Sequence, residues 1–260
     1  MANHIESYVG NDENGNAVKF CLTKAPHVLI GGTTGSGKSS LINLLLAPLV
    51  GRMGPNSLHI YLGDAKKVEF AAYKNAPQVK YIAKTAAEHD YMLQHLCQIM
   101  DERFTWMEQR GVKNIIDQSF WPNIVVFIDE MGDVVLDKCC GKRISNSIIK
   151  LVRLGRAAGI TMILATQNPV CQVINTEIKA NCPTRMALKV STEVNSRVII
   201  DKEGAESLDG NGQMFFMSPY NKGLTKVQSP LVTDEAIRKV VDNAISKYGT
   251  VVRNQSRATV

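Results

Sequence analysis

The fold of this chain is decided by residues 27–46, HVLIGGTTGSGKSSLINLLL. The first four of these residues predict a short buried strand, and the last seven predict the start of a helix. Between them, residues 32–39 match the pattern G-x-x-x-x-G-K-[ST], which is typical of phosphate-binding loops. A strand, a glycine loop and a helix in this order aim the helix N-terminus at a phosphate group. The stretch therefore predicts an α/β fold with a site for a nucleotide.

The chemistry of this loop gives a role to several of its residues. The glycines let the backbone turn tightly and bring several N–H groups onto one anion. The ammonium group of Lys38 would reach the β- and γ-phosphates, and the hydroxyl of Ser39 would be a ligand of Mg²⁺. We therefore predict ATP and Mg²⁺ as cofactors. The predicted nucleotide contacts are Gly32, Thr33, Thr34, Gly35, Ser36, Gly37, Lys38, Ser39 and Ser40.

The composition is that of a globular protein with a substantial core. The chain has 260 residues, 45% hydrophobic and 21% charged, which suits one large α/β domain or two small ones. Residues 1–14 are polar and acidic rather than signal-like, and no apolar run reaches the roughly 18 residues of a membrane helix. The six cysteines follow neither a zinc spacing nor a secreted framework. These features predict a cytoplasmic protein with reduced thiols and no membrane segment.

Much of the net charge of +6 lies near the C-terminus. Five basic residues and one acidic residue follow position 235, which gives +4 for this part and leaves +2 for the rest. These residues are Arg238, Lys239, Lys247, Arg253 and Arg257, with Asp242. The excess is compatible with a solvated tail, and equally with a weak, sequence-independent attraction to a nucleic-acid backbone.

Strand-like and helix-like segments alternate along most of the chain. The alternation predicts a mainly parallel central sheet with helices on both faces. Strands are expected at 27–30, 58–62, 124–128, 161–165, 185–190 and 214–217, the last near an edge of the sheet. Helices are expected from residue 40, at 86–109, at 144–157, and from Thr233 or Asp234 to Gly249. We expect one domain over residues 1–249 and a basic flexible tail at 250–260.

Two further strand ends carry residues suited to nucleotide hydrolysis. Asp129 and Glu130 follow the apolar run 124–128, where P-loop hydrolases place an acid that holds Mg²⁺ and a glutamate that activates water. We predict Asp129 as the Mg²⁺ partner and Glu130 as the general base, although an acid pair in isolation could merely cap a loop. Gln167 follows the strand at 161–165 and is predicted to sense the γ-phosphate or to position water. On its own it could equally be a turn residue.

Arg156 lies at a predicted helix end, in the run RLGRAAG at 153–159. A basic residue there could simply complement the helix dipole. A more specific hypothesis makes Arg156 an arginine finger, which reaches into the ATP site of a neighbouring subunit and neutralises charge in the transition state. That hypothesis requires an oligomer.

Several other segments of the sequence match the motifs of one protein family. They are DAK at 64–66 with Glu69 and Tyr73, RGVKNI at 110–115, RAAGI at 156–160, ATQNP at 165–169, IKANCPTR at 178–185 and GAESL at 204–208. With the approach to the glycine loop and the C-terminal helix, these segments resemble the motor domain of the FtsK/SpoIIIE family, in the FtsK–HerA group of P-loop ATPases. The resemblance covers roughly residues 9–249.

The resemblance implies an ATP-dependent translocase of double-stranded DNA, built as a ring of RecA-like domains, with a hexamer expected. It places Arg156 at the position of the family's trans-acting arginine. It places Lys179 and Arg197 where basic residues track the DNA backbone without reading sequence. Glu193 departs from the pattern, since relatives often have lysine in that segment. A carboxylate there would repel phosphate unless it points elsewhere.

The resemblance also bears on architecture. Chromosome-segregating relatives carry membrane helices, a long linker and a C-terminal winged helix, and none is evident in these 260 residues. We therefore expect a stand-alone minimal motor, of the kind that mobile elements or viruses would use for DNA transfer or packaging. Two alternatives stay open: an ATPase of a protein-secretion system, which would respond to peptides, and an ATP-binding scaffold with little turnover.

Overall fold

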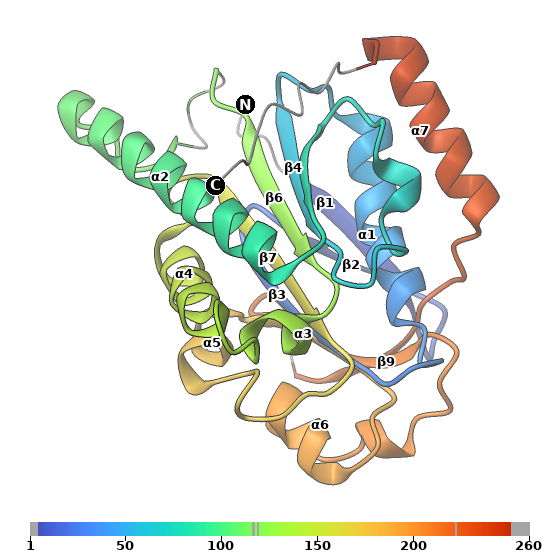
Figure 1. Cartoon of the computed structure of the whole chain (residues 1–260). Coiled ribbons are helices and arrows are strands. Elements are labelled where there is room, and N and C mark those ends of the chain that lie inside the picture. The colour runs from blue at the N-terminus through green and yellow to red at the C-terminus, as the bar shows by residue number, and fades with distance from the viewer. Residues whose placement is uncertain (1–4, 116–117, 119, 222, 251–260) are drawn as a thin grey trace.

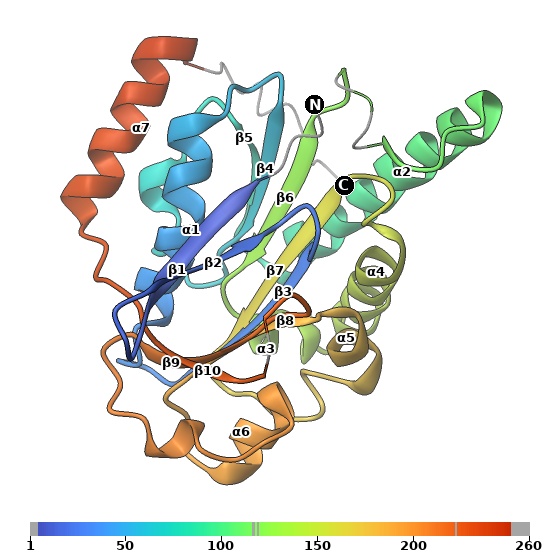
Figure 2. The same ribbon diagram turned by 180° about the vertical axis from the view of Figure 1, so that it is seen from behind.

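The computed structural model describes residues 5–115, 118, 120–221 and 223–250. In this part of the chain the strands form one sheet in the order β2-β1-β10-β9-β8-β3-β7-β6-β4-β5 (Figures 1 and 2). The strands are β1 (Glu6–Asp12), β2 (Ala17–Cys21), β3 (His27–Gly31), β4 (Leu58–Gly63), β5 (Val79–Ala83), β6 (Asn123–Ile128), β7 (Ile160–Thr166), β8 (Thr184–Leu188), β9 (Gln213–Met217) and β10 (Thr225–Gln228). The helices are α1 (Lys38–Arg52), α2 (Ala86–Arg110), α3 (Met131–Val135), α4 (Gly141–Leu154), α5 (Thr176–Asn181), α6 (Glu193–Ile200) and α7 (Asp234–Tyr248).

The sheet has a parallel half and an antiparallel half. Strands β8, β3, β7, β6, β4 and β5 run parallel to one another, which confirms the predicted mainly parallel sheet. From β8 outward, β9, β10, β1 and β2 pair antiparallel. The prediction that the strand at 214–217 lies near an edge was wrong, because β10 and then the β1–β2 hairpin extend the sheet beyond β9. Strands β1, β2, β5 and β10 were not predicted.

Both faces of the parallel half are buried, which explains its continuous apolar strands. In β6, Val125 and Phe127 join the core beneath α1 and α7. The alternate residues Ile124, Val126 and Ile128 join the core beneath α2 and α4. Figure 2 shows α1 and α7 against one face, with α2, α4 and α5 against the other. The predicted helices on both faces are therefore confirmed.

Helix ends follow local capping signals. Thr85 and Glu88 form a capping box at the start of α2, and Gly111 ends that helix at a φ of 63°. The helix predicted at 144–157 runs instead from Gly141 to Leu154 and ends at Gly155. A Cβ on Gly155 would lie 2.5 Å from the Leu151 carbonyl oxygen, so a glycine is needed where the chain turns into β7. Of the predicted tail, all but residue 250 lies outside the described residues.

The turn between α4 and β7, residues 155–159, is held by hydrogen bonds from Arg103 in α2 and from Ile115 beyond it. Arg103 is only 2% exposed and donates to the Ala158 carbonyl at 2.6 Å and to the Pro122 carbonyl at 2.8 Å. Its burial lowers the pKa of the guanidinium to about 10, so the group stays charged at neutral pH. The Ile115 N–H also donates to the Ala157 carbonyl at 2.9 Å. These bonds hold the turn that carries Arg156.

Candidate nucleotide site

The glycine loop leaves the carboxyl end of β3 and opens directly into α1, as predicted. Gly35 and Gly37 have φ angles of 78° and 101°, which side chains rarely adopt. Gly37 is the N-cap of α1; no side chain caps this end, and its first turn carries no acidic residue. The unpaired N–H groups and the positive end of the helix dipole are therefore available to an anion. This arrangement fits a bound phosphate.

Neighbouring strands hold the loop in this shape. The Lys189 carbonyl, just after β8, accepts hydrogen bonds from the Thr33 N–H at 2.9 Å and from its hydroxyl at 3.1 Å. The Gly212 N–H, just before β9, donates to the Ser36 carbonyl at 2.8 Å. A Cβ on Gly37 would lie 2.5 Å from that Gly212 nitrogen. The loop is thus clamped by segments far away in the sequence.

Lys38 and Asp129 form a buried ion pair. The Lys38 ammonium donates to the Asp129 carboxylate and, at 2.6 Å, to the Asp129 carbonyl. The two side chains are 4% and 3% exposed. The structure therefore brings together the residues predicted to hold phosphate and Mg²⁺, with the lysine bonded to the acid.

The predicted Mg²⁺ ligands are a hydroxyl and a carboxylate, and Mg²⁺ prefers such oxygen ligands while keeping several waters. The Ser39 hydroxyl donates to the Glu69 carboxylate at 2.9 Å. Burial raises the pKa of Glu69, and the negative charge of Asp129 raises it further. Ser39, Glu69 and Asp129 thus share one acidic environment that suits a divalent cation. Within the described residues, no cluster of three His, Cys, Asp or Glu forms a metal cage.

Glu130 is held across the ends of two neighbouring strands. Its carboxylate accepts from the Thr166 hydroxyl at 2.6 Å, the Gln167 N–H at 2.7 Å and the Gly132 N–H at 3.2 Å. The Gln167 side chain in turn accepts from the Thr34 hydroxyl at 3.2 Å. The structure therefore joins Glu130 and Gln167 to the glycine loop, although they come from separate strand ends.

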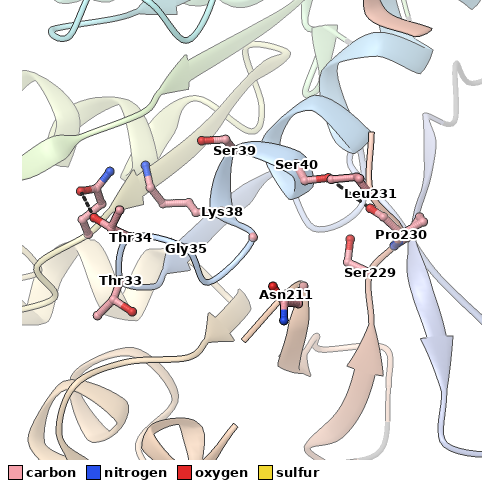
Figure 3. A pocket seen from close by; sticks show the side chains of 13 residues that line it. Thr33, Thr34, Gly35, Lys38, Ser39, Ser40, Asn211, Ser229, Pro230 and Leu231 are labelled. Atoms are coloured by element: carbon pink, nitrogen blue, oxygen red, sulfur yellow. Dashed lines mark hydrogen bonds between the residues drawn. The ribbon is translucent and has the colours of Figure 1, made fainter. Parts of the chain in front are cut away.

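A cavity of about 420 Å³ lies over the loop (Figure 3). It is lined by Thr33, Thr34, Gly35, Gly37, Lys38, Ser39, Ser40, Gln167, Asn211, Gly212, Ser229, Pro230 and Leu231. The last five were not predicted from the sequence. The run Gly210-Asn211-Gly212 is the sequence signal that could have marked the first two, since glycine and asparagine favour the positive φ angles found there. Residues 229–231 carry no such signal.

Arg156 lies far from the glycine loop of its own chain. It is exposed and precedes the amino end of β7, whereas the loop follows the carboxyl end of β3, the parallel neighbour of β7. Its charge is the second cause, after burial, that lowers the pKa of His27 to about 3, and His27 begins β3. The seven residues of β7 span roughly 20 Å. An Arg156 that acts in hydrolysis must therefore act on another chain.

Lys179 and Arg197, the two residues predicted to contact DNA, lie side by side. The Lys179 ammonium donates to the Arg197 carbonyl at 2.7 Å and pairs with Asp201 at 2.6 Å. Lys179 is only 19% exposed, so it is the more enclosed of the two. Arg197 is more than half exposed and pairs with Glu203 at 2.5 Å and with Glu193 at 3.5 Å. The carboxylate of Glu193, the residue that departs from the family pattern, thus faces Arg197.

Comparisons of the sequence with known proteins show the family to which this domain belongs. Residues 3–120 match the model of the FtsK/SpoIIIE family. The DNA translocase FtsK of Helicobacter pylori strain J99 is 35% identical over 244 residues, which cover 90% of this chain and 29% of that protein. The chain carries an ATPase domain of the FtsK/SpoIIIE family. The DNA translocase FtsK of Chlamydia pneumoniae is also 35% identical, over 95% of this chain and 33% of its own length. The chain thus spans about a third of the length of these relatives.

Solved structures confirm the fold of this FtsK-like P-loop ATPase. The conjugation coupling protein TcpA of pCW3, in a monomer form with ATPgS, has a TM-score of 0.79 at 24% identity, over 91% of this chain and 70% of that one. ATPases 2 and 3 of EssC from Geobacillus thermodenitrificans have a TM-score of 0.81 at 18% identity, over 95% of this chain and 49% of that one. None of the helices in the described part of the chain combines the length and the hydrophobicity that a membrane span requires.

Proposed function

We propose that this chain is an ATP-driven translocase of double-stranded DNA that works as a homo-oligomeric ring, with a hexamer expected. The observation that carries the proposal is the convergence of Lys38, Asp129, Glu130 and Gln167 on the glycine loop at one edge of the sheet. It occurs in a chain about 35% identical to proteins named DNA translocase FtsK. Transfer of DNA by a mobile element, or packaging by a virus, is the process we propose for it.

In this proposal each residue of the site has one task. The N–H groups at the start of α1 and the Lys38 ammonium hold the phosphates, and the Ser39 hydroxyl and Asp129 carboxylate would hold Mg²⁺. Bound Mg²⁺ would neutralise charge that develops on the phosphate oxygens. Glu130 accepts the proton of the attacking water, and Gln167 orients that water against the γ-phosphate.

Contacts between the site and α6 support a coupling of hydrolysis to the proposed DNA contacts. The Asn195 amide donates to the Pro169 carbonyl at 3.0 Å, two residues beyond Gln167. The Lys189 carbonyl, which holds Thr33, lies just before α6. A shift of the loop or of Gln167 on hydrolysis would therefore move α6, which carries Arg197. We propose that Lys179 and Arg197 bind duplex phosphates through charge alone, so binding is independent of sequence.

Duplex DNA is expected to raise the steady-state ATPase rate of the wild-type protein several-fold, and the stimulation should weaken as salt increases, because phosphate contacts release counterions. The measurement is ATP turnover with duplexes of unrelated sequence at two salt concentrations. Arg197→Gln should lower the apparent DNA affinity. Lys19→Gln is the control, because Lys19 lies on the antiparallel strand β2 and pairs with Glu6.

The same assay decides between cargoes. Stimulation by signal-type peptides but not by DNA would favour a secretion ATPase and overturn the translocase proposal. A rate unaffected by either, with nucleotide still bound, would favour a scaffold.

Glu130→Gln is expected to lower turnover about 10²-fold or more while leaving ATP affinity within a few-fold, because the amide cannot accept the proton of water. The check is single-turnover hydrolysis beside equilibrium binding of ATP. Asp133→Asn is a matched control, an acid-to-amide change three residues away in α3. Hydrolysis unchanged in Glu130→Gln would remove Glu130 from its role as base.

A further inference from the structure

The wall of the cavity opposite the glycine loop is apolar and unusually exposed. It is formed by Pro230 and Leu231, in the segment between β10 and α7 (Figure 3). Leu231 is 81% exposed, whereas Val232 after it packs against the core. Exposure of a large aliphatic side chain to water is unfavourable. Its place at the rim of a polar cavity would be explained if it contacts an apolar surface of a bound ligand.

Ser40 fixes this segment to the helix that begins at the glycine loop. Its hydroxyl donates to the Pro230 carbonyl at 3.2 Å and accepts from the Val232 N–H at 2.8 Å. The two bonds lie on either side of Leu231. Because both neighbours are tied to α1, the Leu231 backbone is held in place and its side chain stands out from the protein. The exposure of Leu231 is therefore built into the fold.

The position of this wall relative to the phosphate loop indicates what it binds. Gly35, Gly37 and Lys38 line the same cavity as Pro230 and Leu231. A triphosphate on the loop occupies only one side of the cavity, and its volume of about 420 Å³ lies within the range of small-molecule sites. The part of a nucleotide that remains beyond the phosphates is the sugar and the flat, largely apolar face of the base.

We propose that Pro230 and Leu231 form the platform on which the adenine base of ATP packs, and that Ser40 acts as a positioning residue that holds the platform over the loop. The proposal rests on the proposed ATP binding and adds the base contact to it. Contact with the face of the base adds affinity through burial of apolar surface. Ser40, predicted above as a nucleotide contact, then acts on the base through the backbone on either side of Leu231.

The test separates the base from the phosphates by comparing ADP with inorganic tripolyphosphate, which lacks a base. Leu231→Ala is expected to weaken ADP binding roughly tenfold and to leave tripolyphosphate binding unchanged, as measured by calorimetry on the full chain without DNA. Leu231→Phe, which keeps a larger flat surface, should retain ADP affinity. Leu154→Ala is the matched control, because Leu154 is also exposed but ends α4, next to the turn that carries Arg156.

Equal ADP affinity in wild type and Leu231→Ala would overturn the platform, as would an equal loss for ADP and tripolyphosphate, which would indicate damage to the loop. Failure of the wild type to bind either ligand would overturn the platform together with the proposed ATP site. A protein that binds ADP through Leu231 but is not stimulated by DNA would keep the platform and lose only the translocase.

Discussion

Lys38→Ala is expected to reduce ATP hydrolysis by about 10³-fold or more, because the variant loses the cation that neutralises the β- and γ-phosphates. It is also expected to destabilise the nucleotide-free protein by about 3 kcal/mol, since the buried Asp129 carboxylate loses its charged partner. Steady-state turnover and urea-induced unfolding measure the two effects.

The double variant Lys38→Ala with Asp129→Asn is the control for the loss of stability. The neutral amide removes the uncompensated buried charge, so the free energy of unfolding should recover in part while hydrolysis stays absent. If Lys38→Ala were as stable as the wild type, the Lys38–Asp129 pair would not exist in the nucleotide-free protein. If Lys38→Ala hydrolysed ATP at the wild-type rate, the glycine loop would not be the active site.

Arg156→Ala is expected to lower turnover of the assembled protein by about 10³-fold without weakening ATP binding, as removal of an arginine finger does. The physical reason is that Arg156 lies at the amino edge of β7, away from the loop of its own chain. Arg153→Ala is the matched control, because Arg153 is exposed one turn earlier in the last turn of α4. The measurement is turnover at saturating ATP with duplex DNA.

Mixing two inactive variants tests whether Arg156 acts in trans. Arg156→Ala supplies an intact glycine loop and Lys38→Ala supplies an intact arginine, so neighbouring subunits of the two kinds should form some complete sites and regain activity. Mixtures that stay inactive although both variants assemble would overturn the trans role. A protein that stays monomeric with ATP and DNA would do the same.

The sequence anticipated the parts of this site that depend on neighbours along the chain. The strand before Gly31, the glycine loop and the start of α1 form one continuous pattern, and the acids at 129–130 directly follow an apolar strand. Parallel strands end at the same edge of a sheet, so the order of these elements alone places Asp129, Glu130 and Gln167 near the loop. Their hydrogen bonds agree with that expectation.

The parts that sequence reasoning missed depend on pairing between distant segments. The strand at 214–217 was expected near an edge because the weakly patterned strands β1, β2 and β10 gave no sign that they continue the sheet. Residues 229–231 carry no phosphate-binding pattern. Bonds between distant segments hold them at the cavity: the Ser40 hydroxyl donates to the Pro230 carbonyl across 190 residues, and the Ser229 N–H donates to the Gly212 carbonyl.

By itself, the sequence determined the fold class and the glycine loop, and it predicted which residues would face a phosphate, because these follow from local periodicity, glycine conformation and strand order. Only the tertiary structure decided that Lys38 is bonded to Asp129, that Arg156 lies at the opposite edge of the sheet, and that Leu231 stands exposed over the loop. These features arise from the register of the sheet and from hydrogen bonds between distant segments. No local pattern specifies such contacts, since they form only when all the strands are packed together.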